Sequence, residues 1–147
     1  MSGSPNLDAR GAVLRAEVRL RQNAPADALK ILDGALAKLD LAAREQIGNA
    51  QFLRGDALAR LNRYPEAEQA FHEETRLFPG NSEAYARLAV LYAVEHRRVR
   101  EVDALLRAMY AANPRPATSE LAARTLESIG DSTGAARWRS RGRKSKV

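Results

Sequence analysis

A pattern of small residues that recurs along the chain constrains its fold more than any other feature of the sequence. Equivalent small positions fall at Ala28, Ala67, Val102 and Ala135, at intervals of 39, 35 and 33 residues. A period of about 34 residues is typical of stacked helix pairs, because one pair cannot bury its apolar face without a neighbour. The spacing therefore predicts about four helix pairs, in repeats at 9–42, 48–81, 82–116 and 117–140.

Two helical segments separated by a turn are expected in each repeat. Pro25 and Pro65 each follow a turn-like segment, and proline is favoured in the first turn of a helix, where its missing N–H is not needed. Five additional residues around 40–46 separate the first two repeats and predict an extended helix start or a short loop. The predicted helices span residues 8–22, 26–39, 43–61, 65–77, 82–95, 99–112, 117–129 and 132–140.

The composition fits an all-α chain. It holds 28 alanines against 9 glycines and 6 prolines, and no window alternates with the period of two that a half-buried strand requires. The chain has no cysteine, which excludes a disulfide framework, a thiolate metal site and a cysteine nucleophile. No stretch is long and apolar enough to predict a membrane span, and residues 1–8 are expected to be disordered or a remnant of cloning.

The second repeat carries the residues on which a family resemblance depends. Gly55 lies in its first helical segment, and Tyr64, Ala67, Phe71 and Pro79 follow in order after the turn. This order resembles the tetratricopeptide repeat (TPR) family. The third repeat matches through Tyr85, Leu88, Ala89, Tyr92 and Pro114. The resemblance implies an all-α, right-handed α-solenoid of about four helix pairs, with seven to eight helices.

The resemblance also implies a concave groove, lined by the first helix of each repeat, that binds a partner protein or peptide. Phe52 could anchor a ligand there or pack locally, and both interpretations stay open. Familiar members of the family grip a terminal carboxylate with Lys, Asn and Arg side chains, but only Arg87 matches in kind here, which argues against that mode. Helical phasing and the resemblance together place these residues on the groove: Val13, Glu17, Leu20, Arg21, Asn49, Phe52, Asp56, Arg60, Ala86, Val90 and Val94.

Two positions depart from the family's pattern. Arg54 stands where the pattern has leucine, and Glu74 stands where it has alanine.

The basic residues gather at the C-terminal end. Residues 137–147 hold six of them and no acid, while the whole chain has a formal net charge of +6. A flexible tail is predicted over 141–147, with Trp138 either packed under the last helix or free to stack on a nucleic-acid base. The candidate anion-binding residues are Arg137, Arg139, Arg141, Arg143, Lys144 and Lys146.

No constellation of residues predicts catalysis or cofactor binding. The segment that begins at His72-Glu73 starts like a zinc-protease helix, but position 76 holds an arginine in place of the second histidine. We therefore expect a non-enzymatic module with no metal or cofactor, located in the cytoplasm, or in the periplasm if the N-terminus is truncated. A protein or peptide is the expected partner and self-association stays open.

Two alternatives remain. One is a docking or regulatory TPR segment of a larger bacterial enzyme or assembly factor. The other, less favoured, is an adaptor for nucleic acid or an anionic surface that acts through the basic tail.

Overall fold

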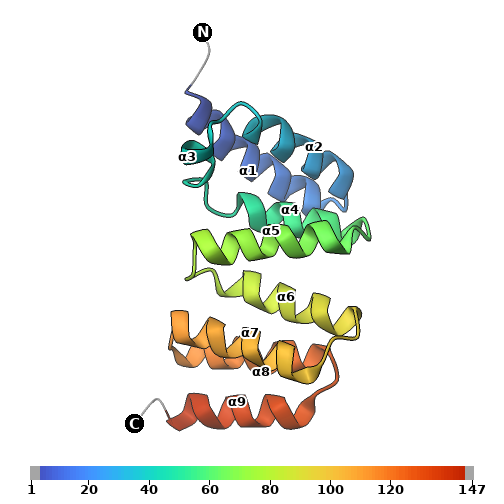
Figure 1. Ribbon diagram of the computed structural model, residues 1–147, viewed down its shortest axis with the longest axis vertical. Coiled ribbons are helices and arrows are strands. Elements are labelled where there is room, and N and C mark those ends of the chain that lie inside the picture. The colour runs from blue at the N-terminus through green and yellow to red at the C-terminus, as the bar shows by residue number, and fades with distance from the viewer. Residues whose placement is uncertain (1–3, 145–147) are drawn as a thin grey trace. The chain divides into compact units, whose positions relative to one another are not determined.

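The computed structural model describes residues 4–144, and within this range the chain forms nine α-helices and no strand (Figure 1). The prediction of an all-α fold is confirmed. The helices are α1 (Pro5–Arg21), α2 (Pro25–Leu36), α3 (Leu41–Arg44), α4 (Ala50–Arg60), α5 (Tyr64–Leu77), α6 (Ser82–Val94), α7 (Val99–Ala112), α8 (Pro116–Ser128) and α9 (Ser132–Lys144).

The chain divides into two compact units, Met1–Phe78 and Pro79–Val147. In the first unit, α1 packs against α2 and α4 against α5, while α2 also packs against α4. In the second unit, α6 packs against α7 and α8 against α9, while α6 and α7 both contact α8. Each unit therefore contains two helix pairs that bury their apolar faces together, as the repeat spacing requires.

The same turn joins the two helices of every pair. One residue in each turn has a left-handed backbone, and these residues are Asn23, Asn62, His96 and Gly130, with φ of 56°, 60°, 57° and 90°. The residue that follows each of them donates its backbone N–H to the carbonyl five residues earlier in the chain, at 2.8–2.9 Å. This hydrogen bond is typical of a Schellman turn. The intervals of 39, 34 and 34 residues repeat the period of the sequence in the backbone itself.

The small positions that define the period lie inside the core. Ala28 and Ala67 are completely buried, and Ala135 and Val102 are nearly so. Gly55 shows why small residues are needed, because a Cβ added to it would lie 2.7 Å from the ring of Phe71. The helices of the pair thus approach as closely as a bare backbone allows.

The predicted helix over 43–61 is wrong, because this segment contains two helices and a break. The Asp40 carboxylate accepts a hydrogen bond from the Ala43 N–H at 2.8 Å and starts α3, which ends after one turn. The chain then turns inward, and α4 begins only after Asn49, whose φ is 68°. Ile47, within the break, is buried in an apolar cluster together with Ala9, Leu36, Leu39 and Ala50.

Both ends of the chain are more ordered than predicted. The helix α1 begins at Pro5, so residues 5–8 are helical, and α9 continues to Lys144, so residues 141–144 do not form a flexible tail. The physical reason at the C-terminal end is burial, because Gly142 lies against Ser119 of α8. Residues 1–3 and 145–147, including Lys146, lie outside the described residues.

Candidate binding site

A hollow of about 250 Å³ lies between α6 and α8, the first helices of the two pairs in the second unit. We call it the α6–α8 hollow. Two residues predicted for the groove, Ala86 and Val90, line it, whereas Val94 lies beyond it at the end of α6 and is half exposed. The complete lining is Glu83, Ala86, Arg87, Val90, Leu121, Arg124, Thr125 and Ser128.

The α6–α8 hollow combines an apolar floor with a charged rim. Ala86, Val90 and Leu121 supply the apolar surface. Arg87 and Arg124 are exposed, and neither guanidinium is paired with a carboxylate among residues 4–144. Such a surface suits a peptide that offers an apolar anchor beside an acidic group.

The hydroxyl groups of the hollow have their protons engaged within α8. Thr125 Oγ1 donates to the Leu121 carbonyl at 2.7 Å, and Ser128 Oγ donates to the Thr125 carbonyl at 2.6 Å. These two side chains can therefore accept hydrogen bonds from a ligand but have no proton left to donate.

Five of the six basic residues predicted as an anion-binding tail, Arg137, Arg139, Arg141, Arg143 and Lys144, belong to α9. Arg139 bridges two carboxylates of α8: it donates to Glu120 at 3.1 and 3.2 Å and also binds Glu127. The hydrogen bonds from Arg139 lower the pKa of both glutamates, and the two glutamates raise the pKa of Arg139. Arg139 is thus neutralised within the fold and is not available to an outside anion.

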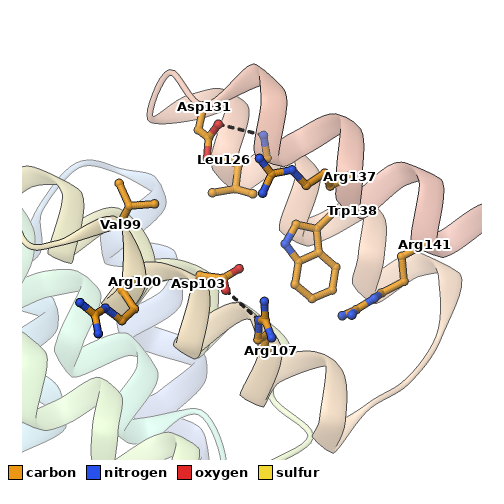
Figure 2. Close-up of a pocket in the computed structure, with 10 residues that line it drawn as sticks. Val99, Arg100, Asp103, Arg107, Leu126, Asp131, Arg137, Trp138 and Arg141 are labelled. Atoms are coloured by element: carbon orange, nitrogen blue, oxygen red, sulfur yellow. Dashed lines mark hydrogen bonds and ion pairs between the residues drawn. The ribbon is translucent and has the colours of Figure 1, made fainter.

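Trp138 lies on α9 and packs toward α7, which corresponds to the packed placement of the two considered from the sequence. Its side chain is buried, and its ring centroid lies 5.8 Å from that of Tyr110 on α7. The Arg141 guanidinium lies over the ring at 4.7 Å. Figure 2 shows Trp138 and Arg141 on α9 facing Asp103 and Arg107 on α7. With its ring covered on these sides, Trp138 does not offer the open face that stacking on a base requires.

In the first unit, four of the predicted groove residues form two ion pairs on the first helices. Glu17 binds Arg21 at 2.7 Å on α1, and Asp56 binds Arg60 at 3.2 Å on α4. Arg60 also donates to the Leu20 carbonyl at 2.8 Å, which connects α4 to the end of α1. These four side chains carry charges of both signs on the first helices of the unit.

The other predicted groove residues of this unit contribute to packing. Val13 packs against the apolar cluster of the first unit, and Leu20 is buried. Phe52 is half buried, with its ring centroid 5.9 Å from that of Phe71. Local packing is therefore the role that the geometry gives Phe52. Asn49 forms the turn before α4, and its N–H is bound within the fold.

Sequence reasoning missed the structural role of Glu74. This side chain is 1% exposed, although it carries a carboxylate. Its two oxygens accept hydrogen bonds from the N–H groups of Asn49 and Phe52, both at 3.3 Å, at the start of α4. A carboxylate placed there replaces a missing cap and meets the positive end of the helix dipole. The departure from alanine at position 74 was the signal that could have revealed it.

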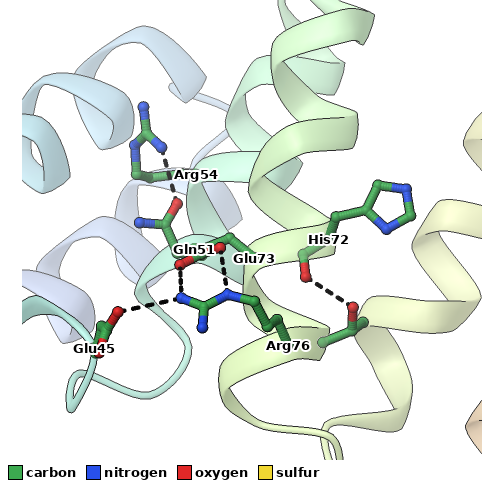
Figure 3. Close-up of polar contacts among 7 residues, drawn as sticks. Glu45, Gln51, Arg54, His72, Glu73 and Arg76 are labelled. Carbon is green, nitrogen blue, oxygen red and sulfur yellow. Dashed lines mark hydrogen bonds and ion pairs between the residues drawn. The ribbon is translucent and has the colours of Figure 1, made fainter.

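A second carboxylate network connects α5 to the segment between α3 and α4 (Figure 3). Arg76 on α5 donates to Glu73 at 2.5 and 3.0 Å and reaches Glu45 at 3.3 Å. The pKa of Glu73 is lowered mainly by this hydrogen bond. Nearby, Arg54 donates to Gln51 and to Asp33 on α2. Arg54, the other departure from the family's pattern, thus connects two helices through an exposed ion pair.

The described residues contain no group of three metal-ligating side chains. No helix within residues 4–144 has the length and apolar character needed to cross a membrane.

Comparison with known proteins finds similarity in structure and not in sequence. No model of a protein family matches the chain, and no curated protein matches it by sequence. A crystal structure of MamA, a TPR-like protein, aligns with a TM-score of 0.68 and 15% identity, over 95% of this chain and 82% of that one.

Two further solved structures agree with the first. A second MamA crystal structure gives a TM-score of 0.66 at 14% identity and covers 94% of this chain and 72% of that one. A double mutant of MamA from strain RS-1 gives 0.62 at 18% identity and covers 97% of this chain and 75% of that one. The chain therefore has a TPR-like helical-repeat fold that is similar to the fold of MamA.

Proposed function

We propose that this chain is a non-enzymatic module that binds a partner protein or peptide on the first helices of its helix pairs. The observation that carries the proposal is the α6–α8 hollow, where an apolar floor meets two exposed arginines that form no ion pair with a carboxylate of the described residues. The TPR-like fold supports it, because stacked helix pairs leave the faces of their first helices free for binding. The cytoplasm is the proposed location.

The expected ligand is an extended or helical peptide segment that places an apolar side chain over Val90 and Leu121. An acidic group beside that anchor would meet Arg87 and Arg124. Because the Thr125 and Ser128 hydroxyl protons are already engaged, a backbone N–H of the ligand is the natural partner for their oxygens. Binding of this kind depends on shape and a few desolvated contacts and requires no chemistry on the partner.

The test is affinity capture of partners with the wild-type chain and with two variants of the hollow, Val90→Glu and Arg124→Glu. Both should reduce capture of the same partners by about tenfold or more, since a charge placed in an apolar contact or reversed at its rim is worth at least ~1.4 kcal/mol. Helix content and melting temperature should stay near wild type, because both side chains face the hollow.

Arg15→Glu is the matched control for Arg124→Glu, because Arg15 is exposed on α1 and both substitutions change the net charge by the same amount. It should leave capture unchanged. Equal capture by wild type and both hollow variants would contradict the proposal.

A further inference from the structure

A second cavity in the second unit lies between α7 and α9, the second helices of their pairs, with α8 at its base. We call it the α7–α9 pocket. Its volume is about 430 Å³, which is larger than that of the α6–α8 hollow. It is lined by Val99, Arg100, Asp103, Arg107, Leu126, Asp131, Gly134, Arg137, Trp138 and Arg141.

The α7–α9 pocket carries an excess of positive charge. Asp103 is bound by Arg107 at 2.7 Å, and Asp131 accepts a hydrogen bond from the Gly134 N–H at 2.8 Å at the start of α9. Both carboxylates are therefore engaged, as the dashed lines in Figure 2 show. Arg100, Arg137 and Arg141 form no ion pair with a carboxylate among residues 4–144. Four arginines against two aspartates leave the lining with a net excess of two positive charges.

Arg141 is already oriented for binding. Its guanidinium lies 4.7 Å from the Trp138 ring centroid and 5.5 Å from that of Tyr110. A guanidinium held over aromatic rings keeps its N–H groups free at the edge, and it loses less rotational freedom when a carboxylate binds. Val99 adds an apolar surface at the opposite side of the pocket, where its side chain is largely exposed.

We propose that the α7–α9 pocket binds an acidic segment of a partner protein, with carboxylates on Arg137 and on Arg141 and a neighbouring apolar side chain against Val99 and Leu126. This site uses different helices from the α6–α8 hollow and goes beyond the function proposed above. A protein segment fits better than a nucleic acid. The aromatic rings are covered by each other and by Arg141, and the charges enclose one pocket in place of a track along a phosphate backbone.

The experiment uses the full chain and a fluorescently labelled peptide of glutamate and leucine, with binding followed by fluorescence anisotropy. Arg137→Gln and Arg141→Gln should each weaken binding by about tenfold. Arg137 is exposed and its side chain forms no ion pair within residues 4–144, so its variant should fold like wild type and test binding alone. A peptide with serine in place of leucine should bind more weakly, because it lacks the apolar contact.

The matched control is Arg143→Gln, which removes the same charge from the same helix but lies outside the α7–α9 pocket. It should bind the peptide like wild type. Three outcomes overturn the proposal: no binding of the peptide, an equal loss in Arg143→Gln, or tighter binding of a single-stranded oligonucleotide than of the peptide. The variant Arg124→Glu separates the two sites, because it should weaken binding only at the α6–α8 hollow.

Discussion

The helix pairs α4–α5 and α8–α9 occupy equivalent places in the two units but are held together by different means. In α4–α5 the fixing groups are internal: the buried Glu74 carboxylate caps α4, and Gly55 lies against Phe71. In α8–α9 the main polar link is on the surface, where Arg139 binds Glu120 and Glu127.

One helix-pair geometry thus tolerates very different distributions of polar groups. A buried carboxylate must keep its partners, because an unpaired buried charge or donor is strongly destabilising. An exposed ion pair can be lost with little effect, because water and salt replace it. The two pairs should therefore respond very differently to substitution.

The largest effect is expected from Glu74→Ala in the first unit. It removes the acceptor for two N–H groups at the start of α4 and leaves a space in the core. The loss of the cap and of buried hydrogen bonds should lower the free energy of unfolding by about 2–4 kcal/mol. Urea unfolding followed by far-UV circular dichroism measures it. The partly exposed neighbour Glu73 supplies the control: Glu73→Ala should change stability by less than about 0.5 kcal/mol. Equal effects of the two substitutions would contradict the internal cap.

The next largest effect is expected from Gly55→Ala, and Gly142→Ala in the second unit is the substitution to compare with it. In Gly55→Ala the new Cβ would lie 2.7 Å from the buried Phe71 ring, and overpacking should destabilise by about 1–3 kcal/mol. In Gly142→Ala the Cβ would lie 3.1 Å from Ser119 Cβ at the end of α9. The better helix propensity of alanine, worth about 1 kcal/mol, should nearly offset that tighter contact. Thermal melts of both variants test the difference, and a larger loss in Gly142→Ala would reverse the comparison.

The smallest effect is expected from Arg139→Gln, and it should depend on pH. Arg139 lowers the pKa of Glu120 and Glu127 in the folded state, so the ion pairs stabilise α8–α9 above the ordinary glutamate pKa. That contribution is lost as the pH falls through the lowered pKa values. The melting temperature of Arg139→Gln should therefore be slightly below wild type at neutral pH and equal to it in acid.

The fluorescence of Trp138, the only tryptophan in the chain, reports on this pair specifically. Arg143→Gln removes the same charge without an ion pair to lose, and its difference from wild type should not depend on pH. If the difference in melting temperature between Arg139→Gln and wild type is the same at neutral and at acid pH, the ion pairs do not contribute to stability.

Sequence reasoning predicted most of the local structure. The turns at Asn23, Asn62, His96 and Gly130 follow from residue types that tolerate a left-handed backbone, and they fall where the helix breaks were expected. The helix ends were predicted less well at α3 and α9. Burial of Ile47 and Gly142 decides these ends, and burial depends on neighbours that are distant in the sequence.

The candidate sites were predicted only in part. Ala86 and Val90 both line the α6–α8 hollow, because helical phasing places them on one face, and their role in binding stays a prediction. Val13 and Phe52 shared that phase but pack against other side chains, which phasing alone does not reveal. The α7–α9 pocket was missed because Arg100 and Arg137 come together only when α7 and α9 are placed side by side.

The periodic helix pairs follow from the order of amino acids alone, since small residues, turn formers and apolar spacing act over a few residues at a time. The tertiary structure decided which charges are neutralised and which remain free. Arg139 and Arg137 are two residues apart and chemically identical, yet one is bound by two glutamates of α8 and the other faces a pocket. The reason is that electrostatic partners are set by distance in space, and only packing brings helices distant in the sequence to within a few ångströms of each other.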